Sequence, residues 1–177
     1  MANLFPIQKQ QKYPIFGRFN ARHGDALTKM CTNLKLFTIE VFTVDEYQSC
    51  PIGYSPMVID DTSAFSYSYS KAGDSDGSNK AAIIIDPDLI ERLDFTENEQ
   101  FAAIAHEIGH IVFQFSENQK QYPGPQAQEI YADDVACQIG LAAPMLSTLT
   151  KLEESGLFSD PKSRFGMRKL MIETQYL

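Results

Sequence analysis

The part of this sequence that most limits its fold is a largely apolar run at residues 101–115, which carries the motif His-Glu-Ile-Gly-His. Thr96, followed three residues later by Glu99, predicts a capping box just before this run, so we expect one long helix. Residues four apart on a helix lie one turn apart on nearly the same face, so His106 and His110 can reach a single point. This spacing favours a metal site.

The glutamate inside the motif has a different expected role. Glu107 projects to the flank of the histidine face, from where its carboxylate reaches a water beside the metal more easily than the metal itself. Hydrolytic zinc sites with this motif use the glutamate as a general base. We therefore predict His106 and His110 as metal ligands and Glu107 as the catalytic base.

A third ligand and a supporting acid are predicted on the next helix. Pro123, Gly124 and Pro125 must interrupt the first helix, and a second helix is expected at about residues 127–141. It places Glu129 nineteen residues after His110, where a carboxylate on a returning helix can complete the site. Asp133 lies one turn further on and is predicted to accept a hydrogen bond from the ring nitrogen of His106 that faces away from the metal.

Small residues on both predicted helices would let them approach closely. Those on the first are Ala102, Ala103, Ala105 and Gly109, and those on the second are Ala132 and Ala136. The direction of Cys137 on its helix differs by about 80° from that of Glu129, so we predict a buried apolar role for this thiol rather than ligation. Asp134 points elsewhere and is expected to face solvent, and His23 is expected at the surface.

The order of the remaining elements predicts an α+β architecture, with the sheet in the first half of the chain and the site in the second. The alternating residues 65–70 favour an edge strand, and the β-branched run 81–86 favours a strand covered on both faces. The predicted strands are at residues 34–47, 65–70 and 81–86. The predicted helices are at residues 20–34, 101–115 and 127–141, with another that begins near residue 144. A last helix is predicted at 161–173, after an N-cap at Ser159 and Asp160.

The size, charge and composition of the chain argue against several classes of protein. Its 177 residues predict one domain, and a net charge of −8 with a pI near 4.8 argues against nucleic acid as a partner. No run of eighteen apolar residues or signal peptide is evident, so no membrane span is expected. Three widely spaced cysteines, Cys31, Cys50 and Cys137, fit reduced thiols, and we expect a cytoplasmic protein.

Residues 96–144 resemble a known family. "HEIGH", followed about twenty residues later by "EIYADDVA", is similar to the gluzincin zinc metallopeptidases, most of all to the compact ImmA/IrrE-type peptidase domain. The resemblance implies a zincin-like fold, in which a small, mostly antiparallel sheet packs on the active-site helix and further C-terminal helices. It also implies one zinc ion bound by His106, His110 and Glu129, with Glu107 as the general base.

These features predict a zinc-dependent peptidase that acts on a protein or peptide, bound in extended form along the edge strand 65–70. The alternative is a zincin-fold module that keeps zinc and regulates a partner without cleaving it, although the intact Glu107 counts against this. A helical domain with a chance motif and no metal is a third possibility. Tyr122, Tyr131 and His23 are all candidates for stabilising an oxyanion. The oligomeric state is not predicted.

Overall fold

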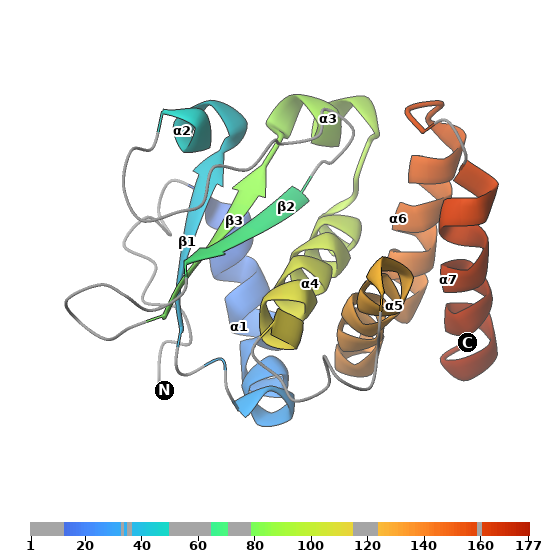
Figure 1. The fold of residues 1–177 in the computed structure, drawn as a ribbon, viewed down its shortest axis with the longest axis horizontal. Coiled ribbons are helices and arrows are strands. Elements are labelled where there is room, and N and C mark those ends of the chain that lie inside the picture. Colours follow the sequence, from blue (N-terminus) through green and yellow to red (C-terminus); the bar gives the residue numbers. More distant parts are fainter. Residues whose placement is uncertain are drawn as a thin grey trace. The chain divides into compact units, whose positions relative to one another are not determined.

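The protein is described by a computed structural model, which places residues 13–32, 34, 37–49, 65–70, 79–114, 124–158 and 161–177. These residues form a mixed α+β structure that is mostly helical, with a small three-stranded sheet (Figure 1). Their contacts group into two compact units, Met1–Asp86 and Pro87–Leu177. The single domain expected over residues 1–177 stays a prediction.

The first unit contains the sheet, which consists of β1 (Phe37–Thr43), β2 (Phe65–Ser70) and β3 (Asn79–Ile85) in the order β1-β3-β2. β1 pairs with β3 in parallel and β2 pairs with it antiparallel. The prediction of a mostly antiparallel sheet is therefore wrong, because the sheet is mixed. β1 and β3 are separated by a connection that is long enough for a parallel crossover, whereas a short hairpin would force an antiparallel pair.

The central strand of this sheet is buried, as its composition predicts. Ala81, Ala82, Ile83 and Ile84 are each at most 1% exposed. On one face, Ala82 and Ile84 pack with Phe42 and Tyr47 in an apolar cluster. β2 lies at one edge of the sheet, which confirms the edge position expected for residues 65–70.

The strand predicted at residues 34–47 is shorter than expected, because a short helix, α2 (Val44–Gln48), follows β1 directly. Thr43 caps this helix: its hydroxyl accepts from the backbone N–H of Glu46 at 3.2 Å, and the Glu46 carboxylate accepts from the N–H of Thr43 at 3.0 Å. A capping box satisfies two helix N–H groups at once, so it ends the strand at Thr43.

Helix α1 (Pro14–Met30) begins earlier than the predicted residue 20. Pro14 lies in its first turn, where the missing N–H of proline costs nothing and its fixed φ favours a helix. The helix ends at Met30, and its apolar residues Phe16, Phe19 and Leu27 are buried.

The second unit is helical. It consists of α3 (Pro87–Arg92), α4 (Glu97–Gln114), α5 (Pro125–Ala136), the π-helical turn η3 (Cys137–Leu141), α6 (Ala142–Glu154) and α7 (Pro161–Gln175). α4 contacts α5 and α6, and α7 contacts the same two helices (Figure 1). The short helix α3 was not predicted; Pro87, expected only to end β3, also starts this helix.

Helix α4 is buried along nearly its whole length, which explains its apolar sequence. Every residue from 101 to 113 is buried. The predicted capping box is present, because the Glu99 carboxylate accepts from the N–H of Thr96 at 2.6 Å and the Glu99 N–H donates to the Thr96 hydroxyl at 3.3 Å. A helix that is apolar on all sides is stable only when all sides are covered.

The helix predicted at 127–141 differs from α5 at both ends. It begins at Pro125, because proline is compatible with a first helical turn, and Gly124, with φ of 109°, directly precedes it. It gives way to η3 at Cys137, where Gly140 adopts φ of 89°. α6 then starts at Ala142, two residues before the predicted Pro144. In α7, the described helix runs to Gln175 instead of Glu173, and the predicted caps Ser159 and Asp160 lie outside the described residues.

The helical run Pro125–Glu154 is long and apolar enough, by length and composition alone, to cross a membrane. Core helices of soluble proteins pass the same test, and Gly140 divides this run into separate elements. The absence of a membrane span therefore stays a prediction, as does the cytoplasmic location.

The two helices α4 and α5 approach each other closely at Gly109. A Cβ atom added to Gly109 would lie 2.7 Å from the Cα atom of Ala132 and 3.1 Å from its carbonyl oxygen. Real Cβ atoms do not come this close to backbone atoms, so only glycine fits. The close approach that the small residues predict is confirmed at this point.

We expect Gly109→Ala to destabilise the protein by about 1–3 kcal/mol, because the added methyl group must push the backbone of α5 away. Gly166→Ala is the matched control on α7, since nothing lies within 4 Å of the Cβ position there. It should gain up to about 1 kcal/mol from helix propensity. Urea unfolding measures both, and a Gly109→Ala protein as stable as the wild type would contradict this packing.

Glu99 links the start of α4 to α6. Its carboxylate accepts hydrogen bonds from Ser147 Oγ at 2.5 Å and from Lys151 Nζ at 2.8 Å, and the residue is 4% exposed. Burial alone raises the pKa of Glu99, but the hydrogen bonds with Lys151, Ser147 and Thr96 outweigh it and lower the pKa to about 2. The folded protein therefore favours the ionised carboxylate.

We expect Glu99→Gln to lower the free energy of unfolding by about 2 kcal/mol at neutral pH. Because the folded-state pKa is depressed, this contribution is complete above the ordinary pKa of 4.5 and is lost as the pH falls to about 2. Urea unfolding of both proteins across this pH range tests it. Glu154→Gln, at an exposed position on α6, is the control. A stability difference that stays constant down to pH 2 would show that the Glu99 charge is not responsible.

Candidate metal centre

Helices α4 and α5 bring three potential metal ligands together, as predicted. His106 and His110 come from α4 and Glu129 comes from α5, and one donor atom of each lies within 4.8 Å of the others. Both histidines are buried, and the side chain of Glu129 is 34% exposed. The group is therefore largely enclosed, with its open side at the carboxylate.

The separations of the donor atoms fit a single tetrahedral ion. The Nε2 atoms of the two histidines are 3.0 Å apart. Glu129 Oε1 is 3.3 Å from His110 Nε2, and Glu129 Oε2 is 3.6 Å from His106 Nε2. Two ligand bonds of 2.0–2.1 Å at a tetrahedral angle place their donor atoms about 3.3 Å apart. The separations of 3.0 and 3.3 Å are close to this value, and the 3.6 Å separation involves the other oxygen of Glu129, so the residues lie close to the arrangement that a zinc-sized ion requires.

Asp133 contacts the site in the way its spacing from Glu129 predicts. His106 Nδ1 and Asp133 Oδ1 are 2.8 Å apart, and both residues are buried. An ionised carboxylate can only accept, so Nδ1 carries a proton toward Asp133, and Nε2 is the ring nitrogen that faces the other donor atoms. Burial lowers the pKa of His106, but the hydrogen bond and charge of Asp133 outweigh it and raise the pKa.

Glu107 is a buried carboxyl beside this group, with 8% exposure. Burial raises its pKa to about 8, while the positive charges of His106 and Arg168 act in the opposite direction. Without a metal, the carboxyl is therefore largely protonated at neutral pH. A divalent cation nearby would favour the carboxylate, which is the form a general base needs.

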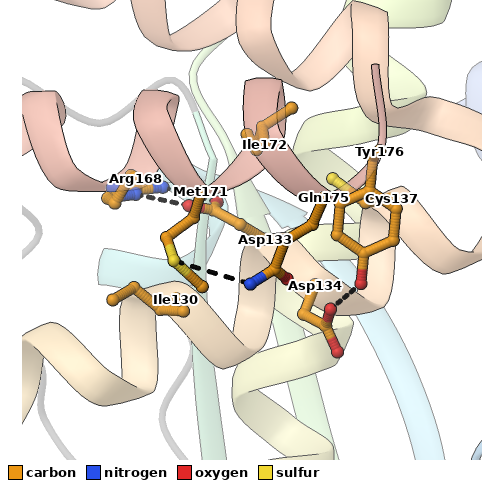
Figure 2. A pocket seen from close by; sticks show the side chains of 9 residues that line it. All are labelled: Ile130, Asp133, Asp134, Cys137, Arg168, Met171, Ile172, Gln175 and Tyr176. Atoms are coloured by element: carbon orange, nitrogen blue, oxygen red, sulfur yellow. Dashed lines mark hydrogen bonds and ion pairs between the residues drawn. The ribbon is translucent and has the colours of Figure 1, made fainter.

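Arg168 on α7 is the residue of this site that sequence reasoning missed. Its guanidinium donates from Nε to Asp133 Oδ2 at 2.6 Å and from Nη2 to Asp133 Oδ1 at 2.7 Å, and Nη1 lies 2.8 Å from Glu129 Oε2. Figure 2 shows Arg168 of α7 in contact with Asp133 of α5, in the lining of a pocket between these helices. Phe165 and Ile172 share its buried helix face, so an arginine in register with an apolar stripe was the available signal.

The charges of the site balance when a divalent cation is present. Glu107, Glu129 and Asp133 supply three negative charges, and Arg168 supplies one positive charge. An ion of charge two makes the sum zero with all three carboxylates ionised. Because unbalanced buried charge is costly, a divalent ion suits this composition when Glu107 is ionised.

Two further side chains near the site, one thiol and one carboxylate, can be compared with their predicted environments. Cys137 is buried and free, as predicted, and burial raises the pKa of its thiol to about 12. The prediction that Asp134 faces solvent is wrong: it is half-buried, with hydrogen bonds from Gln138 Nε2 at 2.5 Å and from the hydroxyl of Tyr176 (Figure 2). Tyr176, which directly follows α7, reaches Asp134 because α7 packs against α5.

The candidates for an oxyanion stabiliser have different positions. Tyr131 is half-buried on α5, with its ring 5.2 Å from that of Phe113. His23 belongs to the first unit, where it is half-buried and its ring lies 5.6 Å from that of Phe19. Tyr122 lies outside the described residues. None of the three therefore gains support as the stabilising group.

Comparison with known proteins found no relatives. No protein-family model matches the chain, and neither a curated protein nor a solved structure matches it. The function of the protein is therefore inferred from its own residues.

Proposed function

We propose that this protein is a zinc-dependent peptidase of the gluzincin type with a zincin-like fold. The observation that carries the proposal is the convergence of His106, His110 and Glu129 from two helices, with Glu107 buried beside them. The same four residues match the ligand and base positions of the family that the motifs resemble. A chance motif would not require the third ligand to lie within reach.

The donor set supports zinc among the divalent ions. Two imidazole nitrogens and one carboxylate are ligands that zinc accepts readily, whereas magnesium and calcium prefer sites made of oxygen atoms. Three protein ligands are also the number found in catalytic zinc sites, where structural sites use four. When bound, zinc would supply Lewis acidity that lowers the pKa of a water and polarises a substrate carbonyl.

The residues of the chain then have distinct tasks. Glu107 would accept the proton of the attacking water and pass it to the nitrogen of the leaving amine. Asp133 would hold His106 in the tautomer and orientation that ligation requires.

The substrate class that we propose is a protein or peptide in extended form. The motifs of residues 96–144 match those of enzymes that hydrolyse peptide bonds. Binding along residues 65–70 stays a prediction from the sequence, because β2 belongs to the first unit and the candidate metal centre to the second. The negative charge of the protein supports a substrate other than nucleic acid. The alternative of a regulatory module that keeps zinc but does not cleave differs in one testable respect, the contribution of Glu107.

We expect the wild-type protein, purified without chelator, to contain about one zinc ion per chain. Glu129→Gln should bind zinc at least tenfold more weakly, because it replaces an anionic ligand by a neutral amide of the same size. Affinity should fall as the pH is lowered, since protons compete for the ligands. Elemental analysis and chelator competition measure these effects. Glu91→Gln, exposed on α3, is the control, and equal zinc loss in both variants would contradict the assignment.

We expect Glu107→Gln to keep its zinc and fold while losing about 10²- to 10⁴-fold in cleavage rate, the usual contribution of a general base. A panel of unfolded proteins and peptides provides the assay, and the variant can also capture substrates that it cannot cut. Zinc-loaded wild type that binds a partner without cleavage, equally well as the variant, would favour the regulatory module. Loss of zinc in the variant would instead make Glu107 a ligand or a structural residue.

A further inference from the structure

One buried guanidinium connects helix α7 to the candidate metal centre. Arg168 is 5% exposed and contacts both Asp133 and Glu129. We propose that Arg168 is a positioning residue that holds these two carboxylates in the metal-binding arrangement and thereby couples the docking of α7 to metal binding. The inference rests on the metal site proposed above, and goes beyond it by assigning a role to a residue outside the motif helices.

The shape of the contact indicates positioning and not charge alone. Arg168 uses three different nitrogen atoms, two toward the oxygens of Asp133 and one toward Glu129. A guanidinium is planar and its N–H groups point in fixed directions, so it defines where both carboxylates lie relative to each other. A lysine ammonium at the same place carries the same charge but is a single nitrogen, and cannot reproduce this geometry.

The contacts of Arg168 extend to two of the three candidate ligands. Asp133 Oδ1 accepts from Arg168 Nη2 at 2.7 Å and lies 2.8 Å from Nδ1 of His106. Glu129 meets the same guanidinium through Oε2, which leaves Oε1 as the oxygen nearer His110. The geometry therefore points to ligation by one Glu129 oxygen only. His106 is oriented through Asp133, and Glu129 directly.

The charge of Arg168 would change metal affinity in the direction opposite to its positioning role. The positive charge of Arg168 repels a metal cation, so a role through charge alone predicts tighter metal binding when the charge is removed and no change when lysine keeps it. Positioning predicts weaker binding even when the charge is kept. Arg168→Lys separates the charge effect from the positioning effect, because lysine preserves the positive charge but lacks the planar set of N–H groups.

The same contact should make α7 sensitive to the metal. Phe165, Arg168 and Ile172 form the buried face of α7, and Arg168 is the member that meets the candidate metal centre. A metal ion that holds Glu129, and holds Asp133 through His106, also holds Arg168, because Arg168 contacts both carboxylates. By linkage, a contact that favours metal binding is strengthened by the metal to the same extent.

The experiment compares wild type, Arg168→Lys and the control Arg164→Lys. Arg164 is an exposed arginine one turn earlier on α7, with its guanidinium 4.6 Å from the centre of the Phe158 ring. Zinc affinity is measured by chelator competition, and the visible spectrum of the cobalt-loaded protein reports the ligand geometry. We expect Arg168→Lys to bind zinc about 10- to 100-fold more weakly, with an altered cobalt spectrum, because loss of an outer partner of metal ligands has this effect. Arg164→Lys should match the wild type.

A second measurement uses the wild type alone and does not depend on how the variant folds. Backbone hydrogen exchange in α7 around Arg168 should slow when zinc is added. Unchanged exchange there, or an Arg168→Lys protein with wild-type zinc affinity and cobalt spectrum, would overturn the proposed role of Arg168 while leaving the metal site intact. A wild type that binds no zinc would overturn the metal site and this inference together.

Discussion

The close contact between α4 and α5 is the constraint on which the rest of the site depends. At Gly109, one glycine lies directly against the backbone of Ala132, and no other residue fits there. This contact falls between the two histidines of α4 and three residues after Glu129 on α5. At a wider helix separation, imidazoles and a carboxylate could not share one ion, because each ligand bond is only about 2 Å long. The glycine of the motif is therefore as important to the site as the histidines beside it.

A buried group of polar side chains accompanies this contact, and its charges explain how it can be stable. Asp133 and Arg168 pair in the interior, and Glu107 lies in the same region with a pKa raised by burial. Buried ions are tolerated when each has a hydrogen-bonding partner of opposite charge. With Glu107 ionised, one divalent ion would balance the charges of these residues.

Much of the local structure could be predicted because it depends on neighbouring residues. Thr96 and Glu99 form a capping box through contacts only three residues apart, and β3 is buried as its β-branched run indicates. The ends of helices and strands were less predictable where neighbouring residues favour different structures. Thr43 caps a helix where a continued strand was expected, and Pro125 starts a helix where it was expected to interrupt one. The direction of β1 depends on a long crossover, for which the sequence offers no local signal.

By itself, the sequence determined which side chains could form a metal site, because a four-residue spacing on a helix places His106 and His110 on one face whatever surrounds them. The same periodicity pairs Glu129 with Asp133. The sequence also predicted the contact of Asp133 with His106, which the structure contains. Only the tertiary structure decided that Arg168, some thirty-five residues later, joins both acids. The reason is physical: helix periodicity acts within one element, whereas the packing of α7 on α5 depends on the shape and charge of whole helices.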